Sequence, residues 1–277
     1  MLRLPAVPVL ALVARMQSLD LLRARGQEFD LTPDGERLAL QVVRAHRLLE
    51  RYFADEARLP LTKVHAAAEH REHTLSPDDV NRLSAELGHP TFDPHGDPIP
   101  TREGIVPPAA GVPLTSWTPE TTGRIVHLED EPPIAFAQIL AEGLRIGQVV
   151  RVIERTLERV VLTDGEHEFR LAPAVAANVF LAPAPDATAA ADVITLAELE
   201  DQVAADVIGL DLACQGFSRR RLMDMGFTEG TRIRPVLRTF AGDPRAYQVR
   251  GTTVAVRRDQ ASHILVRPVG AQKRESA

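Results

Sequence analysis

The chain has 277 residues, of which 44% are hydrophobic and 25% are charged. This composition is typical of a folded protein with two or three small domains, and it excludes a wholly disordered chain. The formal net charge of −6 argues against a protein whose whole surface binds nucleic acid. The single cysteine excludes an internal disulfide framework and a cluster of metal-binding thiolates. We expect a cytoplasmic protein without membrane insertion, since no run approaches the roughly 18 apolar residues of a membrane span.

The first 35 residues carry four arginines and four acidic residues. This segment therefore has no net positive charge with which to neutralise nucleic-acid phosphates. The apolar stretch after Arg3 is similar to the start of a secretion signal, but Pro5 and Pro8 interrupt it. No small-residue cleavage site follows, so we interpret this segment as part of the folded protein.

Three helices are predicted after this segment. Thr32 and Pro33 form a typical helix start, with a hydroxyl N-cap and a proline at the first helical position. A second helix is expected over residues 61–74. A third helix begins after Ser76 and ends at Gly88.

The second half of the chain has a different pattern. Residues 89–116 are rich in proline and are interpreted as a linker. A short helix is expected over residues 136–142, and residues 182–191 are interpreted as a second linker. Strands are expected at residues 124–128, 149–153, 159–163 and 168–171.

A pattern of glycines occurs twice in this half. Residues 139–147 and 222–230 each place two glycines four apart after a short helix, and a β-rich run follows. Two copies of one small barrel explain this repeat better than one large β domain does.

Side chains with metal-binding chemistry gather on the predicted helices. Two of them share a face of the first helix because they lie four residues apart, and four span only about 100° of the second helix, so they can converge. The candidates are His46 and Glu50 on the first helix and His65, Glu69, Glu72 and His73 on the second.

Imidazole nitrogens and carboxylate oxygens without thiolates suit Mn²⁺, Fe²⁺, Co²⁺ or Zn²⁺. The alternative is two charged helix faces whose side chains pair in solvent, and six ligand-capable residues on adjacent helices favour the metal site. The sequence has neither a His-Glu-x-x-His helix nor a nucleophile elbow. We therefore expect a protein that is not an enzyme.

Residues 31–100 resemble the metal-binding and dimerisation domain of the diphtheria-toxin-repressor family, which includes iron-dependent regulators and manganese transport regulators. The segments that carry this resemblance are LTPDG at 31–35, RAHRLLER at 44–51, KVH at 63–65, EHTLS at 72–76, LGHP at 87–90 and GDPIP at 96–100. Residues 193–269 and, less closely, 117–183 resemble FeoA-type modules, which are small SH3-like barrels.

The resemblance implies regulatory metal sites. Iron-type members of the family have cysteine where this chain has Glu69, whereas manganese-type members have glutamate, so the expected cofactor is Mn²⁺ or Fe²⁺. Other divalent transition metals fit the same donors. The first barrel adds ligands in some members; the corresponding positions here are Pro132 and Ala135, so Asp130 or Glu131 would take that role. The implied primary site contains Glu69, Glu72 and His73, and the implied neighbouring site contains His46, Glu50 and His65.

The resemblance also implies a multi-domain α+β fold. Family members begin with a winged helix-turn-helix whose second helix enters the DNA major groove. Residues 9–22 correspond to that helix and residues 22–31 to the wing, whereas the first helix, which supplies further metal ligands in the family, has no counterpart in the sequence. The expected units are a partial winged helix-turn-helix at 1–35, a helical metal-binding and dimerisation domain at 36–104, and FeoA-like barrels at 117–183 and 193–270.

Two functions are consistent with these features. The first is a homodimeric, metal-dependent transcriptional regulator in which metal binding controls binding to operator DNA. The second is a metal sensor or accessory protein that does not bind DNA and acts through protein partners of its FeoA-like barrels. The incomplete helix-turn-helix and its balanced charge motivate the second function.

Overall fold

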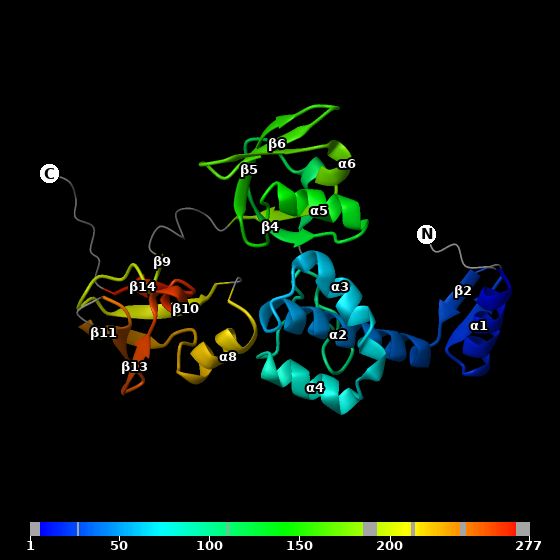
Figure 1. Ribbon diagram of the computed structural model, residues 1–277, viewed down its shortest axis with the longest axis horizontal. Coiled ribbons are helices and arrows are strands. Elements are labelled where there is room, and N and C mark those ends of the chain that lie inside the picture. The colour runs from blue at the N-terminus through cyan, green and yellow to red at the C-terminus, as the bar shows by residue number, and fades with distance from the viewer. Residues whose placement is uncertain are drawn as a thin grey trace.

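The computed structural model describes residues 6–26, 28–109, 111–184, 193–211, 214–238 and 242–269. A small N-terminal unit, a helical unit and two antiparallel β units follow one another along the chain (Figure 1). This arrangement confirms the expected multi-domain α+β fold. No helix within the described ranges is both long and apolar enough to span a membrane.

The N-terminal unit consists of one helix and one hairpin. Helix α1 (Ala6–Ser18) is followed by strands β1 (Leu22–Arg25) and β2 (Glu28–Leu31), which pair antiparallel. In Figure 1 this unit stands at one end of the molecule, and α2 joins it to the rest. Much of α1 is exposed, including Leu10 at 67% and Leu12 at 53%.

Helix starts in the helical unit follow local sequence chemistry. Thr32 caps helix α2 (Pro33–Asp55) by accepting a hydrogen bond from the backbone N–H of Gly35. Ser76 and Asp79 form a reciprocal capping box at the start of α4 (Pro77–Glu86). The buried apolar core of this unit consists of Ala45, Leu48, Val80, Leu87 and Ile99.

The second predicted helix is shorter than expected. Helix α3 (Leu61–Glu69) ends early, and a separate 3₁₀ helix, η1 (Glu72–Thr74), follows it. The backbone N–H of Arg71 donates to the carbonyl of Ala68, which tightens the chain from α-helical to 3₁₀ geometry. The prediction of one continuous helical face over residues 61–74 is therefore wrong, and the last two predicted ligands lie on η1.

Part of the predicted linker at 89–116 is packed into the fold. Residues 93–100 are mostly buried. The carboxylate of Asp93 accepts hydrogen bonds from the backbone N–H groups of His95 and Asp97, at 2.8 and 2.9 Å. Because these backbone groups are satisfied internally, the loop can be buried, and the linker interpretation is wrong for this stretch.

This buried loop lies directly on the first β unit. Gly96 has a φ of +94°, and a Cβ at this position would collide with the carbonyl oxygen of Val126 on strand β4 (Thr122–Leu128). The backbone N–H of Leu128 donates to the carbonyl of His95 at 2.9 Å. Only glycine fits this approach without displacing one of the two segments.

The first β unit, called the first barrel below, has the strand order β3-β8-β4-β5-β6-β7, with antiparallel pairing throughout. The predicted strands coincide with β4 to β7. In Figure 1 this barrel lies above α2 and α3. Its other elements are β3 (Val112–Pro113), η2 (Leu114–Ser116), α5 (Pro133–Ala141), β5 (Val149–Arg155), β6 (Val160–Thr163), β7 (Glu168–Leu171), α6 (Pro173–Ala176) and β8 (Val179–Pro183).

The second β unit, called the second barrel, has the strand order β13-β12-β11-β10-β14-β9. The linker predicted at 182–191 begins within β8, and its continuation from residue 185 lies outside the described residues. The elements of the second barrel are β9 (Ile194–Thr195), β10 (Ala205–Leu210), α8 (Gly216–Asp224), β11 (Arg232–Arg238), β12 (Arg245–Val249), β13 (Thr252–Val256), α9 (Arg258–Ala261) and β14 (Ile264–Pro268).

The repeated glycines occupy equivalent places in the two barrels. In each barrel the pair lies between a short helix, α5 or α8, and the strand that follows it. All four residues have φ between +75° and +96°, which side chains other than glycine rarely adopt. The residues are Gly143 and Gly147 in the first barrel and Gly226 and Gly230 in the second.

Candidate metal centre

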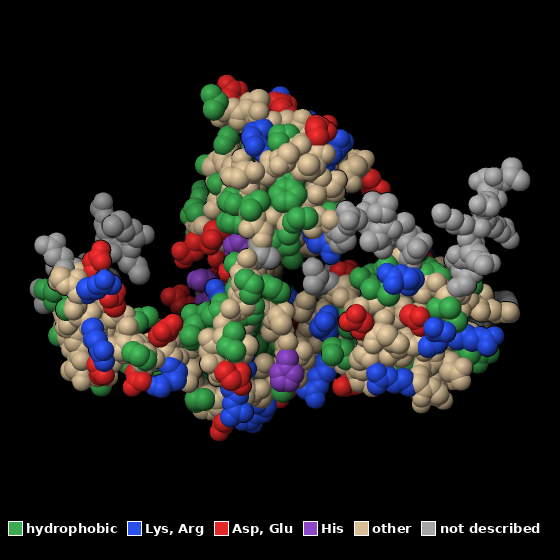
Figure 2. Space-filling view, turned by 180° about the vertical axis from the view of Figure 1, so that it is seen from behind, with side chains coloured by type: hydrophobic (Ala, Val, Ile, Leu, Met, Phe, Trp, Pro, Cys, Tyr) green, Lys and Arg blue, Asp and Glu red, His purple; other side chains and the backbone are tan. Residues whose placement is uncertain are grey.

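Four side chains with metal-binding chemistry lie where the helical unit meets the first barrel, and three of them, His46, Glu50 and His65, form one ligand group. Helix α2 supplies His46 and Glu50, α3 supplies His65, and Asp130 follows β4. Figure 2 shows histidine and acidic side chains gathered beneath the first barrel at this place. We call these four residues the junction site.

The donor atoms of the junction site have the spacing of a metal coordination shell. The Nδ1 atom of His65 lies 3.3 Å from His46 Nε2, 3.2 Å from Glu50 Oε1 and 3.1 Å from Asp130 Oδ2. His46 Nε2 and Glu50 Oε1 are 3.0 Å apart. Bonds of about 2.1 Å to one ion place neighbouring ligand atoms about 3.0–3.4 Å apart. The two imidazole nitrogens of His46 and His65 and one carboxylate oxygen of Glu50 therefore fit a divalent transition metal, and Asp130 adjoins this group through its contact with His65.

Without a bound metal, protonated imidazole rings balance the negative charge of Glu50 in the junction site. The side chain of Glu50 is 2% exposed. Burial favours its neutral form, but hydrogen bonds from His46 and His95 outweigh burial and hold the pKa of Glu50 well below its usual range. Burial likewise lowers the pKa of His46, yet its contacts with Glu50 and Glu72 raise that pKa to about 9. A bound cation would replace the positive charge that these protons supply.

Glu72 lies behind His46 as seen from the junction site. The Nδ1 atom of His46 donates to Glu72 Oε2 at 2.5 Å, while its Nε2 atom faces Glu50. A carboxylate on the far ring nitrogen commonly orients a metal-binding histidine and fixes its tautomer. This geometry suits Glu72 for positioning His46.

The other predicted ligands lie farther out. His73 is 72% exposed and contacts Glu72, with His73 Nε2 3.2 Å from Glu72 Oε1. Glu69 is exposed at the end of α3 and belongs to neither ligand group found among the described residues. The structure thus brings together His46, Glu50 and His65, whereas Glu69, Glu72 and His73 do not surround one point.

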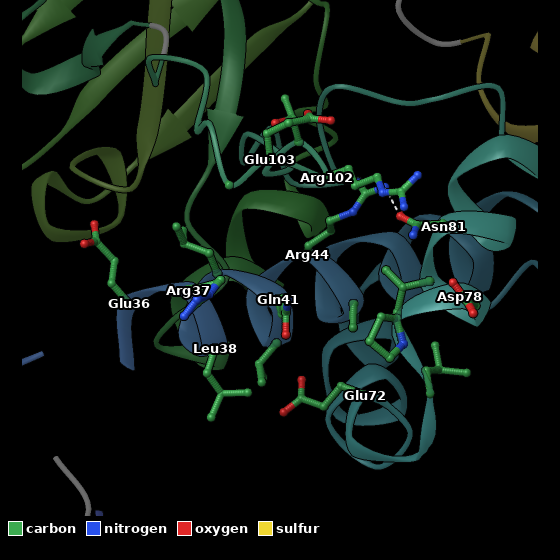
Figure 3. Close-up of a pocket in the computed structure, with 18 of the residues that line it drawn as sticks. Glu36, Arg37, Leu38, Gln41, Arg44, Glu72, Asp78, Asn81, Arg102 and Glu103 are labelled. Carbon is green, nitrogen blue, oxygen red and sulfur yellow. Dashed lines mark hydrogen bonds between the residues drawn. The ribbon is translucent and has the colours of Figure 1, made fainter. Parts of the chain in front are cut away.

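An open groove runs along α2 beside these outer residues. It has a volume of about 1010 Å³, and both Glu72 and His73 line it. Figure 3 shows Glu72 and Leu38 on one side of α2, and Arg102 and Glu103 on the other. A segment packed into this groove would come within reach of Glu72 and His73.

A second ligand group includes a residue that the sequence interpretation missed. Glu50, His95 and Asp130 form this group, so it shares two members with the junction site. His95 Nδ1 lies 3.8 Å from Glu50 Oε2, 4.0 Å from Asp130 Oδ2 and 3.9 Å from Asp93 Oδ2. These distances exceed those of the junction site, so a cation here would require the side chains to move closer together.

His95 is nearly inaccessible to solvent. Its side chain is 1% exposed, and its buried Nε2 atom has no hydrogen-bond partner among the described residues. Burial alone would lower its pKa, but hydrogen bonds to Asp93 and Glu50 raise the pKa to about 10. A buried imidazole with three carboxylates at one nitrogen is a suitable cation ligand. In the sequence, His95 lies between Pro94 and Gly96 in a stretch interpreted as a linker, and this position gave no indication of a ligand.

Comparisons with known proteins support this reading of the fold. The family model "Iron dependent repressor, metal binding and dimerisation domain" matches residues 32–101, and the FeoA domain model matches residues 194–268. The diphtheria toxin repressor of Corynebacterium diphtheriae is 33% identical over 154 residues, which are 52% of this chain and 68% of that relative. The chain belongs to the diphtheria-toxin-repressor family. This confirms the resemblance seen in the sequence.

Other relatives and solved structures agree. The iron-dependent repressor IdeR of Mycobacterium leprae is 39% identical over 124 residues, which are 44% of this chain; the chain thus spans about half, 52%, of that relative. A solved manganese-dependent transcriptional repressor in complex with manganese is 28% identical, with a TM-score of 0.60, covering 65% of this chain and 85% of that chain. The manganese regulator SloR has a TM-score of 0.55 at 24% identity, with the same coverage, and supports the fold alone.

Proposed function

We propose that this chain is a homodimeric, metal-dependent transcriptional regulator with Mn²⁺ or Fe²⁺ as its regulatory ion. The observation that carries the proposal is the junction site, in which His46, Glu50 and His65 place three donor atoms at ligand spacing and Asp130 contacts His65. Relatives described as iron-dependent and manganese-dependent repressors support the same class of metal.

Each residue of the centre has a separate task. A bound divalent cation would take the place of the positive charge that the protonated imidazoles supply to Glu50. Glu72 holds the ring of His46 with Nε2 toward the centre. His65 on α3 contacts Glu50 on α2, and Asp130 of the first barrel contacts His65. Loading the centre therefore biases the arrangement of three parts of the fold, which is the basis of a metal switch.

We further propose roles for the outer residues. Glu69, Glu72 and His73 take part in a second metal site that is completed by a segment packed into the groove along α2. The exposure of His73 and the volume of the groove support this assignment. His95, whose Nδ1 atom faces both Glu50 and Asp93, extends the junction site on the side of the buried loop.

DNA binding and dimerisation are part of the proposal. Helix α1 and the β1–β2 hairpin follow one another as the recognition helix and the wing of a winged helix do. The family model that matches residues 32–101 describes a dimerisation domain. The regulator is favoured over an accessory protein because the relatives compared above are repressors.

The experiment combines metal loading with DNA binding. DNA from upstream of the chain's own gene is titrated with the full chain at low salt, with Mn²⁺ or with a chelator, and the mass of the protein is measured by light scattering. We expect a dimer and metal-dependent retardation of the DNA. Saturated protein that retards no fragment at low salt would exclude direct regulation by this chain.

A further inference from the structure

The second barrel is attached to the helical unit through helix α8. At the start of α8, Glu56 Oε1 accepts a hydrogen bond from the backbone N–H of Phe217 at 2.7 Å. One turn later, the guanidinium of Arg220 donates to the carbonyl of Ala85, at 2.6 Å, near the end of α4. The carboxylate of Glu56 thus accepts from an N–H group at the start of α8, and the guanidinium of Arg220 donates to a carbonyl group at the end of α4. The first N–H groups and the last carbonyl groups of a helix lack α-helical partners within it, so they are open to such contacts.

The contact at the start of α8 is close. Gly216 has a φ of +62°, and a Cβ there would collide with Glu56 Oε1 and lie 3.1 Å from the Cβ of Asp55. Two consecutive carboxylates at the end of α2 thus face the first residues of α8. In Figure 1, α8 lies beside the helical unit, at the side of α2 and α4.

Arg51 lies between this contact and the junction site. It follows Glu50 directly on α2, and its Nε atom is 3.2 Å from Asp55 Oδ2. The two side chains are 9% and 20% exposed, and neither of these atoms has a hydrogen-bond partner among the described residues. Burial lowers the pKa of Arg51, and the carboxylates of Asp55, Asp93 and Glu50 oppose this shift. One buried guanidinium is therefore paired with Asp55 beside α8 and directly follows Glu50 along α2.

We propose that Arg51 couples metal loading of the junction site to docking of the second barrel. The inference rests on the proposed metal binding. A divalent cation at the junction site would carry more positive charge than the His46 proton that it displaces, and would therefore repel Arg51 from that side. Arg51 then pairs more firmly with Asp55 and fixes it against the start of α8, which favours the docked barrel. The second barrel thereby senses the metal state through α2, at a face different from the one that the first barrel uses.

The chain contains its own reporter of this contact. Cys214 is the single cysteine and is 2% exposed. It lines a cavity of about 220 Å³ together with Asp55 from α2 and His263 from the second barrel. Cys214 packs in the core of the second barrel, and Asp55 bounds the cavity beside it from α2. Undocking would remove Asp55 from this cavity and open the path to the thiol, so the rate of thiol modification measures undocking without any added label.

The experiment measures the reaction of the full chain with a disulfide reagent in the presence and absence of Mn²⁺. Calorimetry on the same preparation establishes that Mn²⁺ binds. We expect Mn²⁺ to slow the reaction of Cys214 at least about fivefold, the lower end of typical coupling between two sites. Glu56→Gln should raise the rate with and without metal, because it weakens the contact at Phe217.

Variants of the proposed coupling residue complete the test. Arg51→Met should bind Mn²⁺ and yet lose the effect of Mn²⁺ on the thiol rate, whereas Arg221→Met, at an exposed position of α8, should keep it. Should Arg51→Met fail to fold, Asp55→Asn serves for the same comparison. Mn²⁺ binding without any change of rate in the wild type would overturn the coupling and leave the proposed function intact. Absence of Mn²⁺ binding in the wild type would overturn both.

Discussion

His65 and Asp130 belong to different units of the fold, and yet their side chains are 3.1 Å apart. His65 is on helix α3, and Asp130 follows a strand of the first barrel. The helical unit holds His46, Glu50 and His65, and the first barrel adds Asp130 beside them. Metal binding therefore acts on the contact between the units, and the following predictions test this arrangement.

Glu50→Gln should lower the affinity for Mn²⁺ by at least about 100-fold, since even residues that only orient ligands contribute about 10–100-fold. Glu50 is a member of both ligand groups. Calorimetry provides the affinity, and circular dichroism establishes that the variant is folded. Glu86→Gln changes an exposed acidic residue of α4 and should bind like the wild type. Equal affinities for the two variants would contradict the assignment of Glu50.

Asp130→Asn should weaken Mn²⁺ binding about 10–100-fold, because an amide oxygen carries no charge to balance the cation. The same change should reduce the amount by which Mn²⁺ raises the unfolding temperature of the first barrel. Glu129→Gln is the matched control; its carboxylate is half exposed and faces His127. If Asp130→Asn bound Mn²⁺ as tightly as the control, the ion would not join the barrel to the helices.

Glu72→Gln distinguishes a positioning residue from a ligand. An amide retains a hydrogen bond to His46 but gives up its charge, so we expect a loss of affinity of about tenfold, smaller than for Glu50→Gln. The ratio of bound Mn²⁺ to protein at the junction site should stay the same. Loss of the ion from the junction site itself would show instead that Glu72 is a ligand of that site.

Metal-free protein should lose stability as the pH rises. The pKa values of His46 and His95 are raised from 6.5 to about 9 and about 10 in the folded chain. Their stabilising contribution is therefore complete below about pH 6.5 and is lost as the pH rises through 9 to 10. Each kcal/mol lost should lower the unfolding temperature by about 2–4 °C. Thermal melts from pH 6.5 to 10 test this, and an unfolding temperature that stays level across this range would contradict it.

Mn²⁺ should reverse part of this pH dependence. Ligation requires neutral imidazoles, so binding displaces protons from His46. The gain in unfolding temperature from Mn²⁺ should therefore be larger at pH 8 than at pH 6.5. Calorimetry in buffers with different ionisation enthalpies measures the number of protons released. Binding with no proton release at pH 7 would show that the imidazoles are already neutral.

Local chemistry predicted where helices begin but not where one of them ends. The starts of α2 and α4 depend on Thr32 and Ser76, whose hydroxyls act within four residues. The end of α3 depends on a 3₁₀ turn that brings Glu72 back toward His46, a contact made between separate helices. Helical periodicity in the sequence cannot predict the contact between Glu72 and His46.

The junction site was predicted in part for a similar reason. His46 and Glu50 are neighbours on one helix, so their spacing reveals them. His95 is revealed only by the fold, since it lies in a loop that Asp93 holds together through backbone hydrogen bonds. Asp130 reaches the site because the first barrel packs on that loop. Proline-rich composition indicated chain without regular structure, but it could not indicate burial.

The contact of Gly96 with Val126 limits how the units of this protein can be recombined. A graft of the helical unit onto another barrel would lack both the matching carboxylate and a strand shaped to receive the loop. Conversely, the first barrel alone would carry Asp130 without the imidazole of His65 that it contacts here. A designed metal sensor based on the helical unit and the first barrel therefore has to retain both units and the contact between Gly96 and Val126.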